Sequence, residues 1–450
     1  MGAGPAGFYA AGHLLKLPQV VEVDLIDKLP TPFGLVRSGV APDHQKIKNV
    51  TRVYDKIARS PGFRFFGNVE YGKHIMLEDL KRHYHQIYFS TGAQIDRRLG
   101  IEGEDLARSY SATDFVAWYN GHPDYRHMHF DLSRECIAVV GVGNVAVDVS
   151  RIFCRTIEEL ERTDIADYAL EALANSRVKE IYMLGRRGPA QAAFTNPEAK
   201  ELGAMIGADA YVLPEEAALD PLSRAIFEQQ TDRATAKKVA MIEEFSRKQP
   251  TGKPRRLTIR FLVSPVAFQD DGEGGVGGVR LVKNELYESE DGRLRPRATD
   301  RREELPAEVV FRSVGYRGVA LPGLPFHDAW GVVPNEHGRV INPENGECVR
   351  GVYVGGWIKR GPTGVIGTNK PDALDTVRAM REDQETGQCI DPIEPGAMEA
   401  EETIKARQAQ FVTWEDWERI NAVEVARGQA VGRPRIKFTR TEDMLAMLGS

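Results

Sequence analysis

Two glycine-rich segments limit what this chain can fold into more than any other feature. Residues 2–7 read G-A-G-P-A-G, and residues 141–146 read G-V-G-N-V-A. Each segment matches G-x-G-x-x-G/A and is followed by a helical pattern and then by a strand pattern. Glycines at this spacing let a strand turn tightly into a helix and let a pyrophosphate approach the backbone N–H groups. We therefore expect an α/β protein with two Rossmann-like dinucleotide-binding domains.

The first unit has an acidic residue where adenosine specificity is set. A helix is expected over 8–15 and a strand over Val20–Ile26, which ends at the carboxylate of Asp27. A carboxylate at this place binds ribose hydroxyls and repels a 2′-phosphate, so the site suits FAD or NAD. The strand that should precede the glycines is missing from the pattern, because Met1 stands where it should end. We attribute this to a start assigned too late.

The second glycine-rich unit ends in basic residues, where the first ends in an acidic one. Cys136–Val140 is an apolar run typical of a buried strand, a helix is predicted over 147–153, and a second strand over Val178–Leu184. That strand runs into Arg186 and Arg187, whose guanidinium groups can form a fork-shaped receptor for a 2′-phosphate. The second site should therefore prefer NADP(H). The alternative is that both arginines are merely solvated at a strand end.

The rest of the chain gives coarser signals. Helices are expected within 155–175 and 200–250, and residues 270–275 form a loop tip. A charged helix or linker is expected over 399–410. Further strands are predicted at Leu257–Leu262, Gly278–Val282, Val309–Phe311 and Val352–Val354.

Composition excludes several classes of protein. The length of 450 residues suggests two or three domains, and the net charge of -6 argues against nucleic acid as the main partner. No apolar run approaches the roughly 18 residues of a membrane helix, so we expect no membrane insertion and a cytoplasmic location. The cysteines form no CxxC pair, so no metal site or disulfide framework is indicated. They are Cys136, Cys154, Cys348 and Cys389.

Three longer blocks resemble a known family. They cover residues 30–44 (PTPFGLVRSGVAPDH), 186–195 (RRGPAQAAFT) and 356–370 (GWIKRGPTGVIGTNK). These blocks closely resemble the adrenodoxin reductase-like ferredoxin-NADP reductases, and the resemblance extends to the tail at 432–435. It implies an FAD-binding domain in two parts, 1–94 and 311–450, with an NADP-binding domain at 95–310 inserted between them.

The resemblance also implies cofactor contacts, beside the loop glycines Gly2, Gly4 and Gly7. FAD would be held in both parts of its domain, by Ala6, Asp27, Leu35, Ile75, Trp357, Gly364, Val365 and Ile366. NADP(H) would contact Arg97, Val142, Gly143, Asn144, Val145, Arg186, Arg187, Glu198 and Gly364. His44 and Glu201 match positions that the family associates with catalysis, through polar contacts around the nicotinamide and the isoalloxazine.

The reaction implied is a reduction in two stages. A hydride passes from NADPH to FAD, and single electrons then pass to a ferredoxin-type iron-sulfur protein. Such partners are commonly acidic, and residues 232–260 contain nine basic residues against three acidic ones, which would suit docking. A charge run of this kind is also compatible with an ordinary solvated face.

Three other functions are alternatives to this one. A pyridine nucleotide-disulfide reductase needs a redox-active cysteine pair, which the chain lacks. An NADPH diaphorase or quinone reductase would carry the same two cofactor sites, so the sequence does not separate it from a ferredoxin reductase. A flavin-free NADP-binding regulatory protein would fit if the N-terminus were truly truncated.

Overall fold

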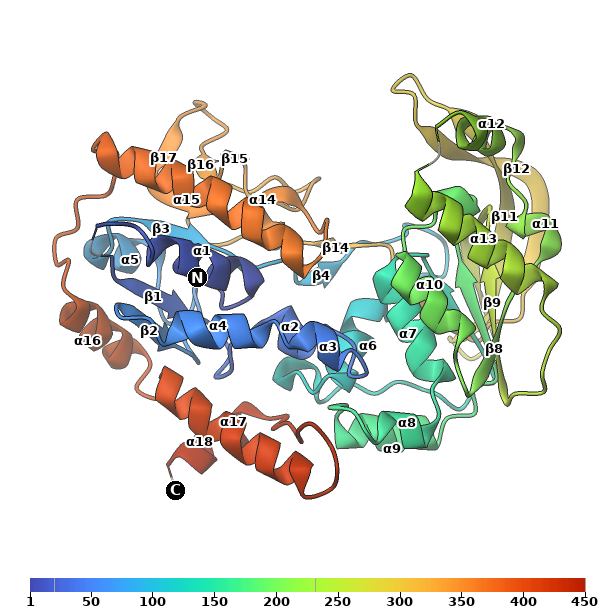
Figure 1. Ribbon diagram of the computed structural model, residues 1–450, viewed down its shortest axis with the longest axis horizontal. Helices are drawn as coiled ribbons and strands as arrows, with labels where there is room; N and C mark the ends of the chain where they lie inside the picture. The colour runs from blue at the N-terminus through green and yellow to red at the C-terminus, as the bar shows by residue number, and fades with distance from the viewer. Residues whose placement is uncertain (20, 231, 450) are drawn as a thin grey trace. The chain divides into compact units, whose positions relative to one another are not determined.

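The computed structural model describes residues 1–19, 21–230 and 232–449, and it divides them into two compact units (Figure 1). Unit 1 comprises 1–95, 120–126 and 315–450, and unit 2 comprises 96–119 and 127–314. Val20, the first residue of an expected strand, and Thr231, within an expected helical stretch, lie outside the described residues. Unit 2 is thus inserted into the sequence of unit 1, and both units are of the expected α/β class.

Unit 2 is built on a six-stranded parallel sheet in the order β5-β13-β6-β7-β9-β8. The predicted apolar run is the central strand β6, in which Ile137, Ala138 and Val139 have no exposed surface. Parallel strands are buried on both faces, which is why they read as continuous apolar runs. The strands are β5 (Ser109–Ser111), β6 (Cys136–Val140), β7 (Glu180–Leu184), β8 (Ala208–Val212), β9 (Arg255–Arg260) and β13 (Val309–Arg312).

Helices cover this sheet, and most agree with the predicted ranges. One prediction is wrong: the stretch 200–250 is not all helical, because Ala208–Val212 forms the edge strand β8. The helices are α6 (Ala112–Tyr119), α7 (Asn144–Cys154), α8 (Ile157–Leu160), α9 (Asp167–Ala174), η2 (Pro189–Gln191), α10 (Asn196–Gly203), α11 (Pro214–Ala217), α12 (Pro221–Gln230) and α13 (Arg233–Arg247).

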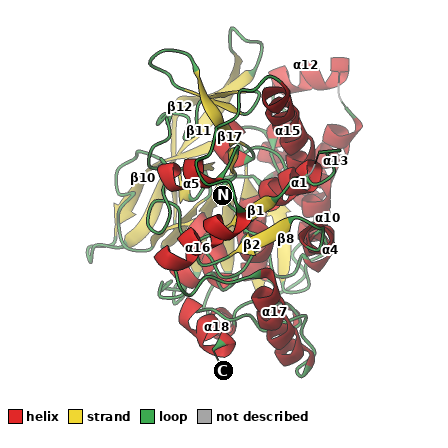
Figure 2. Ribbon diagram, turned by 90° about the vertical axis from the view of Figure 1, so that its left-hand side faces the viewer, coloured by secondary structure: helices red, strands yellow, loops and turns green. Residues whose placement is uncertain are grey.

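Unit 2 also contains a long antiparallel sheet that the sequence indicated only in part. Its strands are β10 (Val263–Asp270), β11 (Val276–Glu288) and β12 (Leu294–Leu305), in that order (Figure 2). The predicted strand Gly278–Val282 lies within β11, and its residues are buried except Arg280. β12 was missed because it is a largely exposed outer strand rich in charged residues, which lacks the apolar alternation of a half-buried strand.

Unit 1 holds two separate sheets, a parallel β1-β2 pair and a mixed sheet in which only β17 and β3, among the described strands, pair in parallel. β1 (Val23–Ile26) pairs only with β2 (Phe63–Phe66), and β3 (Ile87–Phe89) forms the edge of a four-stranded sheet in the order β15-β16-β17-β3. The other strands of that sheet are β15 (Asn335–Glu336), β16 (Arg339–Ile341) and β17 (Cys348–Val354). Two-residue strands β4 (Ile95–Asp96) and β14 (Tyr316–Arg317) occur where the chain passes between the units.

Helix α1 packs against α15 in unit 1, as Figure 1 shows. None of the described helices of either unit has the length and apolar character that a bilayer crossing needs. The helices of unit 1 are α1 (Pro5–Leu14), α2 (Leu35–Ser38), α3 (Gln45–Lys48), α4 (Thr51–Ala58), α5 (Leu77–His83), η1 (Pro123–Tyr125), α14 (Trp357–Arg360), η3 (Ile366–Thr368), α15 (Asn369–Glu385), α16 (Ala397–Arg407), α17 (Trp414–Gln429) and α18 (Thr441–Leu448).

A buried ion pair joins α17, near the end of the chain, to α2, near its start. Glu424 of α17 has no exposed surface and accepts two hydrogen bonds from Arg37 of α2, at 2.5 and 2.8 Å. It also accepts the backbone N–H of Phe438 at 2.8 Å. Burial opposes ionisation, but the charge and hydrogen bonds of Arg37 outweigh it and lower the pKa of this carboxyl.

We expect Glu424→Gln to lower the free energy of unfolding by about 3–5 kcal/mol, because it leaves the Arg37 guanidinium buried without its counter-charge. Since the pKa of Glu424 is lowered from 4.5, the stabilisation is present above that pH and is lost as the pH falls further. Urea unfolding at neutral and acid pH measures both effects.

The matched control is Glu418→Gln on the same helix. Its carboxylate pairs at 2.9 Å with Arg59, whose side chain is 71% exposed, so the loss should stay below about 1 kcal/mol. Equal destabilisation by the two substitutions would show that the buried pair has no special role.

Candidate dinucleotide-binding sites

The glycine loop of unit 1 is shaped for a ligand at the start of α1. Gly2 has φ 99°, and a Cβ there would lie 2.5 Å from the carbonyl oxygen of Ser90, so only glycine fits. A Cβ on Gly4, in contrast, would meet nothing within 4 Å. Gly4 is the N-cap of α1, no side chain caps this end of the helix, and its first turn contains no acidic residue. Backbone N–H groups at such a helix end attract a phosphate.

Asp27 is hydrogen-bonded to the backbone of this loop. Its carboxylate accepts the backbone N–H of Ala3 at 2.6 Å and that of Leu29 at 2.9 Å. Burial raises the pKa of this carboxyl, and the two backbone donors partly oppose that shift. The residue predicted to bind ribose therefore lies directly at the glycine loop.

Two segments distant in sequence also meet this loop. The N–H of Phe33 donates to the carbonyl of Ala3 at 2.8 Å, and a Cβ on Gly34 would lie 3.0 Å from the Cα of Gly4. On another side, a Cβ on Gly356 would lie 2.8 Å from the Cβ of Ala6. The structure thus brings the segments that carry Leu35 and Trp357 next to the loop, as the expected FAD site requires.

The other residues of unit 1 that were predicted to lie at the site have different surroundings. Ile75 is 1% exposed and lies in an apolar cluster with Ile26 and Phe66, so its side chain is not available to a ligand. Gly364 and Val365 are exposed and lead into Ile366, the first residue of η3. Ile366 is half-buried and packs against the apolar cluster that includes Ala3 of the glycine loop and Phe8 of α1. His44 is the half-buried N-cap of α3, and its N–H donates to the carbonyl of Ala41 at 3.0 Å.

The glycine loop of unit 2 repeats the first one. Gly141 has φ 133°, and a Cβ there would collide with the carbonyl oxygen of Ser313. Gly143 again faces open space and is the N-cap of α7, whose first turn has neither a capping side chain nor an acidic residue. Both loops therefore lead into a helix end that suits an anion.

A second strand-to-helix connection closes over this loop. The N–H groups of Ala193 and Phe194 donate to the carbonyl of Val142 at 3.1 and 3.0 Å. The N–H of Thr195 donates to Oδ1 of Asn144 at 3.3 Å. The structure thus gathers Val142 to Val145 with the segment that follows Arg186 and Arg187.

The paired arginines have the environment of an anion receptor. Arg186 is exposed, and among the described residues neither guanidinium forms an ion pair with a carboxylate. Burial and the neighbouring charge of Arg186 lower the pKa of Arg187, so an anion bound between them would be stabilised. The backbone is held in place from β11, because Asn284 donates to the carbonyl of Arg186 at 2.9 Å.

Helix α10 carries the two predicted glutamates. Glu198 lies in its first turn, and its Oε2 is buried without a hydrogen-bond partner among the described residues. Glu201 lies one turn on, 3.3 Å from a guanidinium nitrogen of Arg151, which is fully buried and also pairs with Asp148 at 2.9 Å. Arg97 is exposed in the connection after β4.

Several cations of the basic run over 232–260 are used inside unit 2. Arg260 is 3% exposed and is held by Glu216 and Glu303 at 2.8 Å, so it cannot meet a partner. Arg255 donates to backbone carbonyls, and Lys238 donates to the carbonyl of Ala192. Strand β9 and the inner face of α13 use these cations within the fold.

Sequence reasoning missed two residues that shape the sites. Asp372 of α15 accepts the N–H of Gly356 at 2.7 Å and pairs with Lys359 at 3.1 Å, which fixes the turn before Trp357. Asn284 holds the turn at Arg186, as described above. Asp372 follows the 356–370 block by two residues, which was a usable signal, whereas nothing in the sequence near Asn284 indicates its role. The described residues contain no group of side chains suited to a metal ion.

Comparison with known proteins gives full-length matches. The chain is 44% identical to the NADPH-ferredoxin reductase FprA of Mycobacterium tuberculosis over 459 residues, covering 99% of this chain and 97% of the relative. It is 39% identical to the mitochondrial NADPH:adrenodoxin oxidoreductase of Arabidopsis thaliana, covering 99% and 94%. No family model matches the chain.

A solved structure agrees with the fold over its full length. Mycobacterium tuberculosis FprA in complex with NADPH superposes with a TM-score of 0.92 at 42% identity, covering 100% of this chain and 98% of that one. Identity at this level over whole chains, with twin glycine loops of the expected geometry, confirms the resemblance found in the sequence. The chain belongs to the adrenodoxin reductase-like ferredoxin-NADP reductases.

Proposed function

We propose that this protein is an FAD-dependent NADPH-ferredoxin reductase. The observation that carries the proposal is the contrast between two glycine loops of the same shape. The loop of unit 1 is followed by the carboxylate of Asp27, whereas that of unit 2 is followed by Arg186 and Arg187, which have no carboxylate partner among the described residues. One site thus suits an adenosine without a 2′-phosphate, and the other suits one that carries it.

The residues of unit 1 fit FAD. Gly4 and Ala6 at the start of α1 would receive the pyrophosphate, and Asp27 would accept ribose hydroxyls. Further contacts are assigned to Leu35, Ile75 through its backbone, Trp357 and Gly364–Ile366. Bound FAD supplies the chemistry that links the two-electron oxidation of NADPH to one-electron reduction of an acceptor.

The residues of unit 2 fit NADP(H). Val142–Val145 would receive the pyrophosphate at the start of α7, and Arg186 and Arg187 the 2′-phosphate. The buried, unpartnered Oε2 of Glu198 suits a hydroxyl or amide donor of the nucleotide. Arg97 and Gly364 are assigned as additional contacts.

The electron acceptor is a ferredoxin-type iron-sulfur protein. This assignment follows the relatives, which are called NADPH-ferredoxin reductase and NADPH:adrenodoxin oxidoreductase. The basic run 232–260 does not identify the docking surface, because several of its cations are used inside unit 2.

The absorption spectrum of the purified chain, recorded anaerobically before and after NADPH, tests the cofactor assignment. A two-band flavin spectrum that bleaches with NADPH is expected, followed by faster reoxidation with a ferredoxin than with a quinone. A colourless protein that still binds NADPH would instead favour a flavin-free regulatory role. Preferential reaction with quinones would favour a diaphorase.

Replacing both arginines by glutamine (Arg186→Gln with Arg187→Gln) should raise KM for NADPH by about 100-fold or more and leave KM for NADH nearly unchanged. Each charge-assisted hydrogen bond to the 2′-phosphate contributes about 1.5–3 kcal/mol, or about 10- to 100-fold. Initial rates with both donors measure the effect.

Arg256→Gln is the control for that pair, because Arg256 lies in the same unit but already pairs with Glu180 at 2.9 Å. It should affect neither donor. Equal losses for NADPH and NADH in the double variant would contradict the phosphate assignment.

His44 and Glu201 are assigned positioning roles around the reacting rings. We expect His44→Ala and Glu201→Gln each to lower kcat with NADPH by about 10- to 100-fold, since small displacements of reacting groups are costly. Thermal unfolding should be nearly unchanged for Glu201→Gln, because Asp148 still pairs with Arg151.

Glu171→Gln, on the exposed side of α9, serves as the control. If Glu201→Gln instead lowers the unfolding temperature and leaves kcat unchanged, Glu201 acts only as a counter-charge for Arg151.

A further inference from the structure

Residues 361–366 form a loop between α14 and the start of η3 in unit 1. This loop contains Gly364, Val365 and Ile366, which are assigned to FAD. Gly364 has φ 81°, and a Cβ there would lie 2.6 Å from Oγ1 of Thr368, so only glycine fits the turn. Gly364 and Val365 are exposed. An exposed loop pays a large entropic cost to keep one conformation, so its shape depends on the side chains that bind it.

Arg360, the last residue of α14, is hydrogen-bonded to this loop. Its side chain is 19% exposed. One terminal nitrogen of the guanidinium donates to the carbonyl of Thr363, and the other donates to Oδ1 of Asn369 at 2.8 Å. Asn369, the first residue of α15, donates in turn to the carbonyl of Ile366 at 3.1 Å. A single guanidinium thus connects both halves of the loop.

These hydrogen bonds determine the direction of the N–H groups in the loop. In a planar trans peptide, the C=O and N–H bonds point in opposite directions. Since Arg360 binds the carbonyl of Thr363, the N–H of Gly364 in the same peptide unit points away from the guanidinium. The carbonyl of Val365 is bound by a backbone N–H of η3 at 3.0 Å, so the N–H of Ile366 points away from that helix. Neither N–H group has an acceptor among the described residues.

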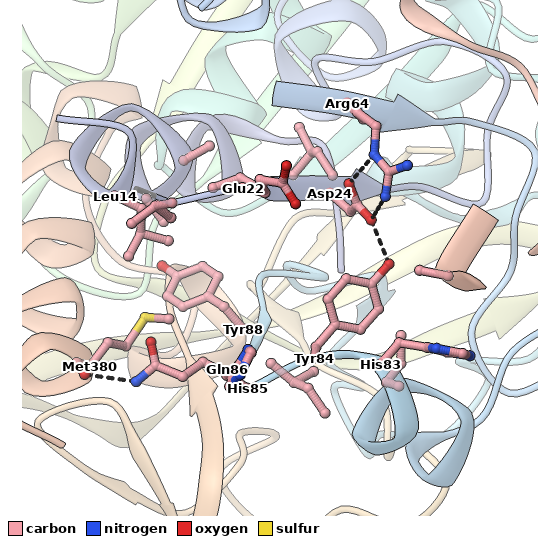
Figure 3. Close-up of a pocket in the computed structure, with 18 of the residues that line it drawn as sticks. Leu14, Glu22, Asp24, Arg64, His83, Tyr84, His85, Gln86, Tyr88 and Met380 are labelled. Atoms are coloured by element: carbon pink, nitrogen blue, oxygen red, sulfur yellow. Dashed lines mark hydrogen bonds and ion pairs between the residues drawn. The ribbon is translucent and has the colours of Figure 1, made fainter. Parts of the chain in front are cut away.

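Asp372 of α15 orients the guanidinium. Its carboxylate accepts the N–H of Gly356 at 2.7 Å and lies 3.7 Å from Nε of Arg360, which leaves both terminal nitrogens to the loop. Tyr88 of β3, which lines the cavity shown in Figure 3, packs against the same turn. A Cβ on Gly355 would collide with the Tyr88 hydroxyl. The turn into α14 therefore has little freedom to move.

We propose that Arg360 is a positioning residue for the flavin, acting through the 361–366 loop. It turns the Thr363 carbonyl away from the ligand and, with Asn369, leaves the N–H groups of Gly364 and Ile366 as donors toward it. This inference rests on the proposed binding of FAD to unit 1.

Such donors suit the chemistry of the flavin ring. The isoalloxazine carries ring-nitrogen and carbonyl acceptors, and it gains negative charge when it is reduced. Donors that are already oriented stabilise charge that develops in front of them. The guanidinium strengthens the Gly364 donor further, because hydrogen bonds in series polarise one another.

The test compares the unaltered chain with three variants. Arg360→Met removes the charge and both hydrogen bonds but keeps an unbranched side chain, and Arg360→Lys keeps the charge without the planar fork. Arg381→Met is the matched control, because Arg381 lies on α15 in a half-exposed pair with Glu385 at 2.7 Å. Four quantities are measured: the Kd for FAD, the midpoint potential of the bound flavin, amide hydrogen exchange without FAD, and the unfolding temperature.

Arg360→Met should raise the Kd for FAD by about 10- to 100-fold, because it removes two charge-assisted hydrogen bonds that shape the loop. The midpoint potential should become more negative, since donors facing the charge of the reduced flavin are lost. Exchange at the Val365 N–H should become faster, because its bond to Oγ1 of Thr368 at 3.1 Å depends on the loop conformation. Arg360→Lys should recover only part of the affinity, and Arg381→Met should change none of these quantities.

Unchanged FAD affinity and midpoint potential in Arg360→Met would overturn the inference, even if the unfolding temperature fell, because Arg360 would then only stabilise the fold. Full recovery by Arg360→Lys would also overturn it, since charge alone would explain the effect. An unaltered chain that binds no FAD would refute the proposed function and this inference with it. The other two results would refute the inference alone.

Discussion

The backbone hydrogen bonds of Met1, Gly2 and Ala3 are the constraint on which unit 1 depends. Met1 pairs with β3, Gly2 pairs with β1, and Ala3 donates to the carboxylate of Asp27. These contacts place the glycine loop between two separate sheets and set the direction in which α1 starts. The loop can bind a pyrophosphate only if its N–H groups are held in that direction, so the ligand site depends on this pairing.

In the proposed assignment, the same loop geometry serves two nucleotides because their specificity is set elsewhere. Gly4 and Gly143 each leave open space at a helix N-cap, and neither residue distinguishes one adenosine from another. Discrimination between the two would then come from the end of the following strand. There, the Asp27 carboxylate is held by backbone donors, while burial and the charge of Arg186 disfavour the charged form of Arg187, which a bound anion would offset. The fold supplies the phosphate site, and one or two side chains determine which adenosine is preferred.

The parts of the fold that could be predicted from sequence are those with strong local patterns. β6 is a continuous apolar run in a parallel sheet and is buried from Ile137 to Val140, while β7 begins at Glu180 and buries Ile181, Met183 and Leu184. The sequence did not indicate β8, because it is a five-residue strand between helical segments. It did not indicate β12 either, because that strand is exposed and highly charged. Asp372, Asn284 and the burial of Arg260 depend on contacts between residues far apart in the sequence, which no local pattern records.

A series of specific contacts connects the C-terminal helices to the glycine loop of unit 1. Glu424 binds Arg37 in α2, and α2 follows directly after Phe33 and Gly34, which contact Ala3 and Gly4. Phe33 also packs edge-on against the ring of Trp417. Trp417 lies about two helical turns before Glu424 on α17. Since buried aromatic contacts and a desolvated ion pair both resist small displacements, α17 fixes the position of the 33–37 segment. The tail of the chain therefore acts as part of the support for the glycine loop at its beginning.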